Sequence, residues 1–259
     1  MTTDGIARDG LQGGDVAIIT GGGGGFGRAF CLRLAKMGAR IAIWDIDDKE
    51  GEETQRQVQE IGGEARFFHV DLSDADSIAQ TSQKTLETMG APYCIINNAS
   101  VFPRGEVIEL SLAQWEWTLK VNMTAPFIIA RTFGPLMIER GRGVVINLAS
   151  GRAIEGAAKG ANYACTKAAM LSLTKSLALE WARHGIRVNA IIPGQSLTAM
   201  PLVATTEAAM HAQALTRNPM GRIGYPEDVA GLAAYLVSPD AAYMTGQGIA
   251  INGGAVMIP

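Results

Sequence analysis

The stretch Val16-Ala-Ile-Ile-Thr20-Gly-Gly-Gly-Gly-Gly25-Phe-Gly27 decides the fold of this chain. Its first four residues are apolar and mostly β-branched, which predicts a short buried strand, and an amphipathic helical pattern follows the glycines. The N–H groups at the start of such a helix bind phosphate, so the turn predicts a dinucleotide pyrophosphate site. In this interpretation Gly21 permits the tight turn, Gly25 lets the backbone approach phosphate and Gly27 permits close helix–strand packing.

Strand and helix patterns alternate from this turn to the end of the chain. The strands are apolar throughout, which predicts burial on both faces, and the connections are short. The sequence therefore predicts an α/β fold, a doubly wound, seven-stranded parallel sheet with helices on both faces. The expected strands are 16–19, 40–44, 66–70, 93–96, 144–148, 187–192 and 248–251, and the expected helices are about 26–37, 47–61, 74–89, 117–138, 163–183 and one opening at Pro226.

The chain of 259 residues shows no internal repeat or linker and is predicted to be one domain. Residues 1–13 are polar and glycine-rich and are expected to be a flexible tail, which leaves 14–259 as the single folded domain. Residues 195–224 have no strong period. Because long irregular segments at a strand end are usually functional, this segment is predicted to be a substrate-binding lid.

Bulk composition excludes several classes of protein. The net charge is −3 with no basic block, so neither nucleic acid nor an anionic membrane is an expected partner. No apolar run approaches the ~20 residues of a membrane span, and the N-terminus lacks a secretory pattern. Cys31, Cys94 and Cys165 are odd in number and widely spaced, which predicts reduced thiols and a cytoplasmic protein. The three histidines lack metal-ligand spacing, so no metal is predicted.

A tyrosine and a lysine carry the predicted chemistry. Tyr163 and Lys167 are four residues apart and share one helix face. An ammonium beside a phenol favours the phenolate, so Lys167 is expected to lower the pKa of Tyr163 and make it an acid or base near neutral pH. Ser150 closes the preceding strand. With the glycine turn, these residues predict hydride transfer with a nicotinamide cofactor.

The acid that ends the second strand predicts which nicotinamide cofactor binds. Asp45 can accept hydrogen bonds from the adenosine ribose and repel a 2′-phosphate. Neither the glycine turn nor the residues just after Asp45 include Arg or Lys, so we expect NAD rather than NADP. The alternative for Asp45 is an N-cap of the next helix, a role that Asp47 could equally fill.

Over about residues 14–256 the chain resembles the short-chain dehydrogenase/reductase family. The segments that carry the resemblance are Thr20-Gly21-xxx-Gly25-x-Gly27, Asp71-Leu72, Asn97-Asn98-Ala99, Val121-Asn122, Ser150, Tyr163-xxx-Lys167 and Pro193-Gly194-xxx-Thr198. The family usually has glycine after Asn-Asn-Ala, whereas this chain has Ser100, whose side chain is expected to narrow the cleft.

The resemblance implies a Rossmann-type sheet and an Asn-Ser-Tyr-Lys tetrad. It implies that Asp71 contacts the adenine, that Asn98-Ala99 flank the adenosine ribose, and that Asn122 anchors a water leading from Lys167 to solvent. The expected catalytic residues are Asn122, Ser150, Tyr163 and Lys167. The expected cofactor contacts are Gly21, Gly25, Phe26, Gly27, Asp45, Ile46, Asp71, Leu72, Asn98, Ala99, Tyr163, Lys167, Pro193, Ser196 and Thr198.

The substrate is expected to be a secondary alcohol or ketone, because most candidate cleft residues are apolar. The expected substrate contacts are Ser100, Phe102, Ser150, Arg152, Tyr163, Leu197 and Met200. Arg104, Arg152 and Lys159 could instead bind an anion or lie on the solvated surface. The alternatives to an NAD-dependent alcohol dehydrogenase are an NADPH-dependent ketoreductase, for example on a 3-oxoacyl thioester, and a catalytically silent NAD-binding sensor. Two helices that are apolar on more than one face predict a homotetramer.

Overall fold

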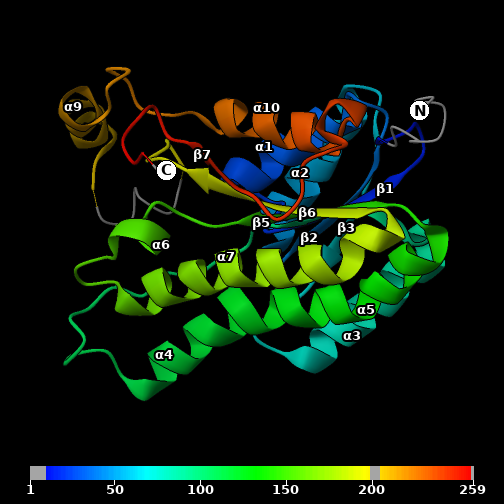
Figure 1. Cartoon of the computed structure of the whole chain (residues 1–259), viewed down its shortest axis with the longest axis horizontal. Coiled ribbons are helices and arrows are strands. Elements are labelled where there is room, and N and C mark those ends of the chain that lie inside the picture. Colours follow the sequence, from blue (N-terminus) through cyan, green and yellow to red (C-terminus); the bar gives the residue numbers. More distant parts are fainter. Residues whose placement is uncertain (1–9, 199–204, 258–259) are drawn as a thin grey trace.

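The protein is built around one seven-stranded parallel sheet (Figure 1). The structure, a computed structural model, describes residues 10–198 and 205–257. The strand order is β3-β2-β1-β4-β5-β6-β7, and every adjacent pair is parallel. This confirms the predicted fold class. The strands are β1 Val16–Thr20, β2 Arg40–Asp45, β3 Glu64–His69, β4 Pro92–Asn97, β5 Gly143–Leu148, β6 Ile186–Pro193 and β7 Gly248–Ile251.

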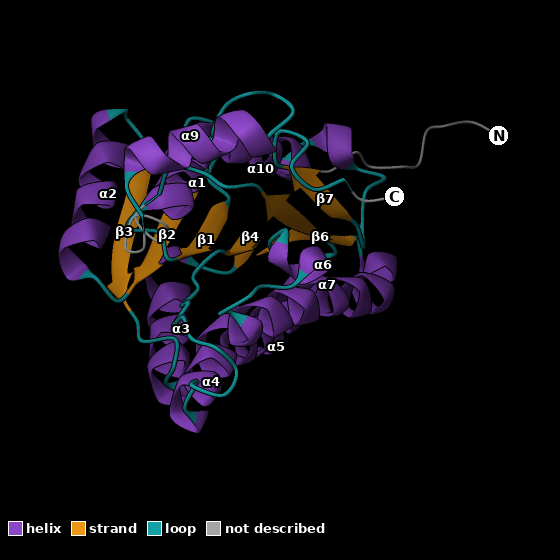
Figure 2. Ribbon diagram, turned by 90° about the vertical axis from the view of Figure 1, so that its left-hand side faces the viewer, coloured by secondary structure: helices purple, strands orange, loops and turns teal. Residues whose placement is uncertain are grey.

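Helices cover both faces of the sheet (Figure 2). One layer contains α1, α2 and α10, and the other contains α3, α5 and α7. The chain order reverses direction beside β1, between β1 and β4, which is where ligands bind in open sheets of this kind. The helices are α1 Gly25–Ala35, α2 Asp48–Glu60, α3 Ala75–Met89, α4 Leu112–Leu119, α5 Ala125–Arg140, α6 Arg152–Glu155, α7 Ala161–Trp181, α9 Glu207–Arg217 and α10 Pro226–Val237.

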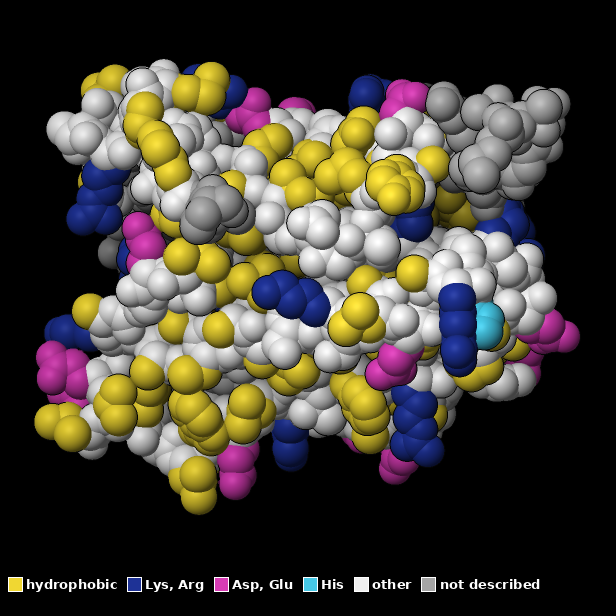
Figure 3. Space-filling view, viewed as in Figure 1, with side chains coloured by type: hydrophobic (Ala, Val, Ile, Leu, Met, Phe, Trp, Pro, Cys, Tyr) yellow, Lys and Arg dark blue, Asp and Glu magenta, His cyan; other side chains and the backbone are white. Residues whose placement is uncertain are grey.

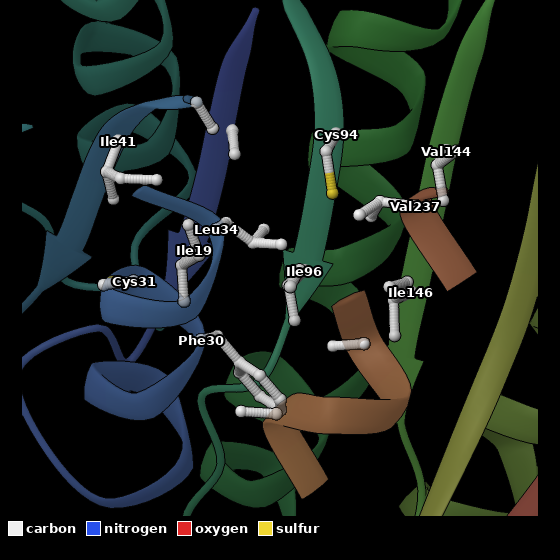
Figure 4. Packing of buried hydrophobic residues seen from close by; sticks show 14 of the residues in the cluster. Ile19, Phe30, Cys31, Leu34, Ile41, Cys94, Ile96, Val144, Ile146 and Val237 are labelled. Carbon is white, nitrogen blue, oxygen red and sulfur yellow. The ribbon is translucent and has the colours of Figure 1, made fainter. Parts of the chain in front are cut away.

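The continuous apolar strands supply two cores at once. On β1, Ile18 packs into the cluster beneath α3, α5 and α7, whereas its neighbour Ile19 packs into the cluster beneath α1 and α10. Figure 4 shows Ile19, Ile96 and Ile146 of three neighbouring strands on the second of these faces. Side chains alternate along a strand, so a strand buried on both faces must be apolar at every position.

The helix expected over 117–138 begins earlier and is interrupted. Ser111 and Gln114 form a reciprocal capping box that starts α4 at Leu112. The turn Lys120–Thr124 (η1) is π-helical and contains Asn122, and α5 continues from Ala125. The prediction of one regular helix was therefore wrong. The Ser-x-x-Gln signal for its start is visible in the sequence, but a π turn, which often marks a functional site, has no comparable pattern.

The described residues of the predicted lid, 195–198 and 205–224, include regular structure that the sequence pattern does not suggest. Thr206 caps α9, and Met210 of this helix is fully buried. The two ends of the segment are joined, because Ser196 and Gly224 form a parallel β-bridge and the Leu197 N–H donates to the Gly224 carbonyl across 3.0 Å. Met200, a predicted substrate contact, lies outside the described residues.

Part of the expected N-terminal tail is anchored to the domain. The Leu11 N–H donates to the Val237 carbonyl at 2.8 Å, and the Arg142 guanidinium donates to the Gly10 carbonyl at 3.0 Å. The packed domain therefore begins before the predicted boundary at residue 14. No helix in the described ranges has the length and apolarity required to cross a membrane.

Candidate active site

A cavity of about 400 Å³ lies at the carboxyl ends of the strands. It runs from the glycine turn after β1 to the tyrosine–lysine pair on α7. Its walls come from the loops that follow β1 to β6, which is the edge where the sequence places its motifs. It is lined by Gly21, Gly24, Gly25, Phe26, Trp44, Asp45, Ile46, Val70, Asp71, Leu72, Asn98, Ala99, Ser100, Val101, Trp117, Val121, Leu148, Ala149, Tyr163, Lys167, Pro193 and Thr198.

The glycine turn forms a cradle that side chains would fill. Gly21 has a φ of 62°, a left-handed conformation that favours glycine. A Cβ on Gly27 would lie 1.9 Å from the Gly21 carbonyl oxygen, so the first turn of α1 presses directly on the glycine turn. Gly27 thus serves packing of the helix against the turn, rather than against the strand, and does not line the cavity. This bare backbone at a helix N-terminus fits a pyrophosphate.

Asp45 is positioned by the turn that it faces. Its Oδ2 accepts from the Gly23 N–H at 2.7 Å and its Oδ1 accepts from the Asp47 N–H at 3.0 Å. Asp47, not Asp45, caps α2 by accepting from the Glu50 N–H. A carboxylate has lone pairs beyond these two bonds, so Asp45 can still accept from a ligand at the cavity wall.

A cation close to this turn was missed in the sequence. Arg28 lies one residue beyond Gly27, and its guanidinium donates to the Gly23 carbonyl and to the carboxylate of Glu50 at 2.6 Å. The Gly23 carbonyl also accepts from the Thr54 hydroxyl. This region therefore contains a cation, although the turn itself has no Arg or Lys. The carboxylate of Glu50 pairs with the charge of Arg28.

Two polar residues fix the loops beside the cradle. The Asn98 side chain donates to the carbonyl oxygens of Thr20 and Gly21, at 2.9 and 3.0 Å. The Asp71 Oδ1 accepts from both the N–H and the hydroxyl of Ser73. Asn98 thus ties the end of β4 to the end of β1, which gives the cavity a rigid floor.

Lys167 is buried, and it is 3% exposed. Its ammonium donates to the Leu148 carbonyl at 2.7 Å, and its Nζ lies 5.5 Å from the centre of the Tyr163 ring. Burial lowers the pKa of Lys167 to about 7, because the charged form loses hydration. In the cofactor-free protein the lysine is therefore close to neutral at physiological pH.

The pKa of Tyr163 differs from the prediction. Burial raises it above its ordinary value, whereas the hydrogen bond with Ser150, the charge of Arg152 and the hydrogen bond with Ser100 act in the opposite direction. Lys167 is not among the groups that lower the pKa of Tyr163, and burial weakens the charge of the lysine as well. The raised pKa keeps the phenol protonated at neutral pH.

Asn122 holds a loop. Its Oδ1 accepts from the Val101 N–H at 2.8 Å, and its amide nitrogen donates to the Val101 carbonyl at 2.9 Å and to the Thr166 hydroxyl at 3.2 Å. Both amide hydrogens and one of the two lone pairs of Oδ1 are engaged, which leaves one lone pair for the expected water. The π turn thus places Asn122 to clamp the loop that follows β4.

The remaining predicted residues lie in different places. Ser150 hydrogen-bonds with Tyr163, and Arg152 begins α6 beside it. Phe102 stacks on the Tyr163 ring. Ser196 faces a second, smaller cavity, and Leu197 packs in the small core beneath α9, so neither lines the main cavity.

Several cavity-lining residues were missed in the sequence. Trp117 on α4 is 44% exposed and lines the cavity. Trp44 and Val70 precede Asp45 and Asp71, so extending each strand-end motif by one residue would have found them. Val101, Val121, Leu148 and Ala149 carry no distinctive pattern. In the described part of the chain, no three His, Cys, Asp or Glu side chains group to hold a metal ion.

A family model described as "Enoyl-(Acyl carrier protein) reductase" matches residues 22–256. With the seven-stranded sheet and the relatives below, this match shows that the chain belongs to the short-chain dehydrogenase/reductase family, whose members are oxidoreductases that bind a nicotinamide cofactor.

Characterised relatives and solved structures match nearly the whole chain. A 2,5-dichloro-2,5-cyclohexadiene-1,4-diol dehydrogenase from Sphingobium indicum is 34% identical and covers 93% of this chain and 96% of its own. A galactitol 2-dehydrogenase (L-tagatose-forming) from Cereibacter sphaeroides is 33% identical, and the match covers 93% of this chain and 94% of the relative. The crystal structure of a putative NAD(P)-dependent gluconate 5-dehydrogenase from Beutenbergia cavernae, with bound NADP at low occupancy, has a TM-score of 0.89 and 34% identity over 94% and 97% of the two chains.

Proposed function

We propose that the protein transfers hydride between a secondary alcohol and NAD, with Tyr163 as the acid and base. One observation carries the proposal: a single cavity has the glycine cradle at one end and Tyr163 with Lys167 at the other. Dehydrogenases that act on alcohols among the relatives support the same reaction class.

The residues of the chain have separate tasks in this reaction. Gly21 and Gly25 would receive the pyrophosphate, and Asp45 the adenosine ribose. When bound, the nicotinamide accepts hydride from the alcohol carbon or returns it. Tyr163 removes the proton from the alcohol oxygen, or donates it in reduction. Ser150 donates a hydrogen bond that positions this oxygen.

Lys167 acts on both the cofactor and the tyrosine in the proposal. Ribose hydroxyls close to its Nζ would add acceptors to the Leu148 carbonyl and favour the ammonium. A charged Lys167 then favours the Tyr163 phenolate. The low pKa of the lysine and the raised pKa of the tyrosine in the free protein thus describe a site that becomes active on cofactor binding.

NAD is the proposed cofactor, supported by the carboxylate of Asp45 on the cavity wall and by the Arg28–Glu50 ion pair. The NADP bound in the structure of the gluconate 5-dehydrogenase supports the alternative, an NADPH-dependent ketoreductase. A cytoplasmic location is proposed as well, since Cys31 and Cys94 are free and buried.

A substrate screen tests the function. Polyols, sugar acids and cyclic secondary alcohols are offered with NAD⁺ or NADP⁺, and NADH or NADPH absorbance is followed. The expected result is turnover of at least one secondary alcohol with NAD⁺. Binding of NADH without turnover of any member would instead support a sensor, and turnover with NADP⁺ alone would support the ketoreductase alternative.

A further inference from the structure

The ring of Phe102 lies flat against the ring of Tyr163. Their centroids are 4.4 Å apart and their planes differ by 17°. The guanidinium carbon of Arg104 lies 4.6 Å from the centre of the Phe102 ring. Aromatic pairs stacked at such a distance stabilise each other beyond the effect of their buried area. Phe102 thus occupies one face of the proposed acid and base.

The loop that presents Phe102 is fixed on both sides of this residue. Before it, Val101 is clamped by the Asn122 amide through both its N–H and its carbonyl. After it, the Pro103 carbonyl accepts from the Asn162 side chain at 3.1 Å, and the Gly105 N–H donates to the Lys159 carbonyl at 3.2 Å. The position of the ring is therefore set by the backbone around it and does not depend on the stack alone.

The segment before α7 is shaped to receive the ring. A Cβ on Gly160 would lie 2.6 Å from Phe102 Cε2, so only glycine leaves room for the stack. The adjacent Lys159 has a φ of 57°, and it is the single residue other than glycine with a positive φ in the described ranges. A strained backbone persists where its surroundings determine it, and such sites cluster around functional groups.

We infer that Phe102 is a positioning residue for Tyr163: through the stack it holds the phenol toward Ser150 and keeps water from one face of the ring. This inference rests on the proposed role of Tyr163, and it replaces the expectation that Phe102 contacts substrate. The charged groups around the phenol come from three other places, Lys167 on α7, Arg152 on α6 and Arg104 beyond Phe102.

The first test removes the ring. In Phe102→Leu the phenol gains water, so its pKa falls, and kcat falls by about tenfold or more because misplacement of a reacting group is costly, while KM changes little. Titration of tyrosinate absorbance, assigned by its loss in Tyr163→Phe, measures the pKa without any turnover. Phe102→Tyr retains the stack and should restore both values. Phe133→Leu, which removes a core ring packed on Trp44, should change neither the pKa nor the pH profile.

The second test leaves Phe102 in place. Gly160 has a φ of −164°, outside the left-handed region, and the tight contact that Gly160→Ala introduces is with the Phe102 ring. This variant should reproduce the lowered pKa and kcat of Phe102→Leu. Gly231→Ala is the matched control, since nothing lies within 4 Å of a Cβ at that position. Combined with Phe102→Leu, Gly160→Ala should add no further loss, because the two changes act through one contact.

The outcomes separate this inference from the proposed function. An unchanged Tyr163 pKa and unchanged kcat in both Phe102→Leu and Gly160→Ala would overturn the positioning role. A large rise in KM of Phe102→Leu with kcat and pKa unchanged would also overturn it, and would return Phe102 to substrate contact. If the wild type oxidises no alcohol, the proposed function fails, whereas the spectroscopic titration still tests the stack.

Discussion

The Lys167 ammonium donates to the Leu148 carbonyl across 2.7 Å, at the point where β5 ends. This bond joins α7 to the last residue of a central strand. It fixes the lysine beneath the cavity, in a position too dry to retain its full charge. The state of the free protein is therefore defined by a lysine near neutrality and a protonated tyrosine.

This relationship predicts that NADH binding takes up a proton near pH 8. Lys167 has a pKa of about 7 in the free protein and is mostly neutral at that pH. Ribose hydroxyls and the negative pyrophosphate favour the ammonium and raise the pKa, so protons enter on binding. Calorimetry in buffers of different ionisation enthalpy measures the uptake. Lys167→Met should abolish it, and a wild-type binding enthalpy independent of buffer would contradict the prediction.

The raised pKa of Tyr163 predicts opposite pH dependences for the two reaction directions. Oxidation needs the phenolate, so its rate should rise with pH, whereas reduction needs the phenol and should fall. Tyr163→Phe should lower kcat by about 10²–10⁴-fold, the usual share of general acid–base catalysis. NADH fluorescence should show nearly unchanged cofactor binding. Near-normal turnover in this variant would mean that another group moves the proton.

The Arg28–Glu50 pair predicts how cofactor preference can be altered. The wild type should prefer NAD, because Asp45 repels a 2′-phosphate and Glu50 occupies Arg28. Replacing both acids, in Asp45→Asn with Glu50→Gln, leaves the charge of Arg28 without its carboxylate partner, and a charge-assisted bond to phosphate is worth about 1.5–3 kcal/mol. Steady-state kinetics with both cofactors should then show a larger gain in kcat/KM with NADP⁺ for the double variant than for Asp45→Asn alone.

A matched variant controls the cofactor experiment. Glu53 also lies on α2 but pairs with Arg56, so Glu53→Gln combined with Asp45→Asn should give no gain beyond the single change. Equal or better efficiency of the wild type with NADP⁺ would refute the predicted preference.

Exposed apolar side chains predict assembly through the helices of one layer. Leu179 on α7 is 85% exposed and Phe127 on α5 is 49% exposed, and hydrophobic side chains are spread over the face formed by α4, α5 and α7 (Figure 3). We expect a homotetramer, since closed symmetry would cover these groups. Light scattering after size exclusion measures the mass. A 27.4 kDa monomer at micromolar concentration would refute it.

A charge on that face should weaken the assembly. Leu179→Asp places a carboxylate where an apolar contact is expected, and burying it would be costly. When Leu179→Asp is diluted, its scattering mass should therefore begin to fall at a higher protein concentration than that of the wild type does. Ile61→Asp, at the end of α2 in the other helix layer, is the control and should leave the mass unchanged.

Much of the fold could be predicted because its strands follow simple burial rules. Most of the strands are apolar, and each strand before β7 is followed by a helix, so the parallel direction and the ligand-binding edge follow from local pattern. The π turn at Asn122 and the helix α9 could not be predicted in this way. Both depend on contacts distant in the chain, such as the Val101 clamp and the buried Met210.

The residue types of the site could also be predicted, but not their electrostatics. The sequence places Tyr163 and Lys167 on one face, and it suggests that the lysine lowers the tyrosine pKa. That inference assumes a charged lysine, and the charge depends on burial, which only the packed structure reveals. The stack of Phe102 on Tyr163 could not be predicted for a similar reason, because the two residues lie far apart along the chain.

The bridge between Ser196 and Gly224 has a consequence for how this protein can change. The segment between these residues leaves the domain and rejoins it at one place. Because its two ends are held together, it forms an excursion whose residues can be exchanged. Thr198, at the start of this excursion, lines the main cavity and lies against Gly25, so it belongs with the glycine cradle. A graft that keeps Thr198 and replaces α9 leaves the strands and the cradle unchanged, and α9 is therefore the place where we expect substrate choice to be separable from cofactor choice.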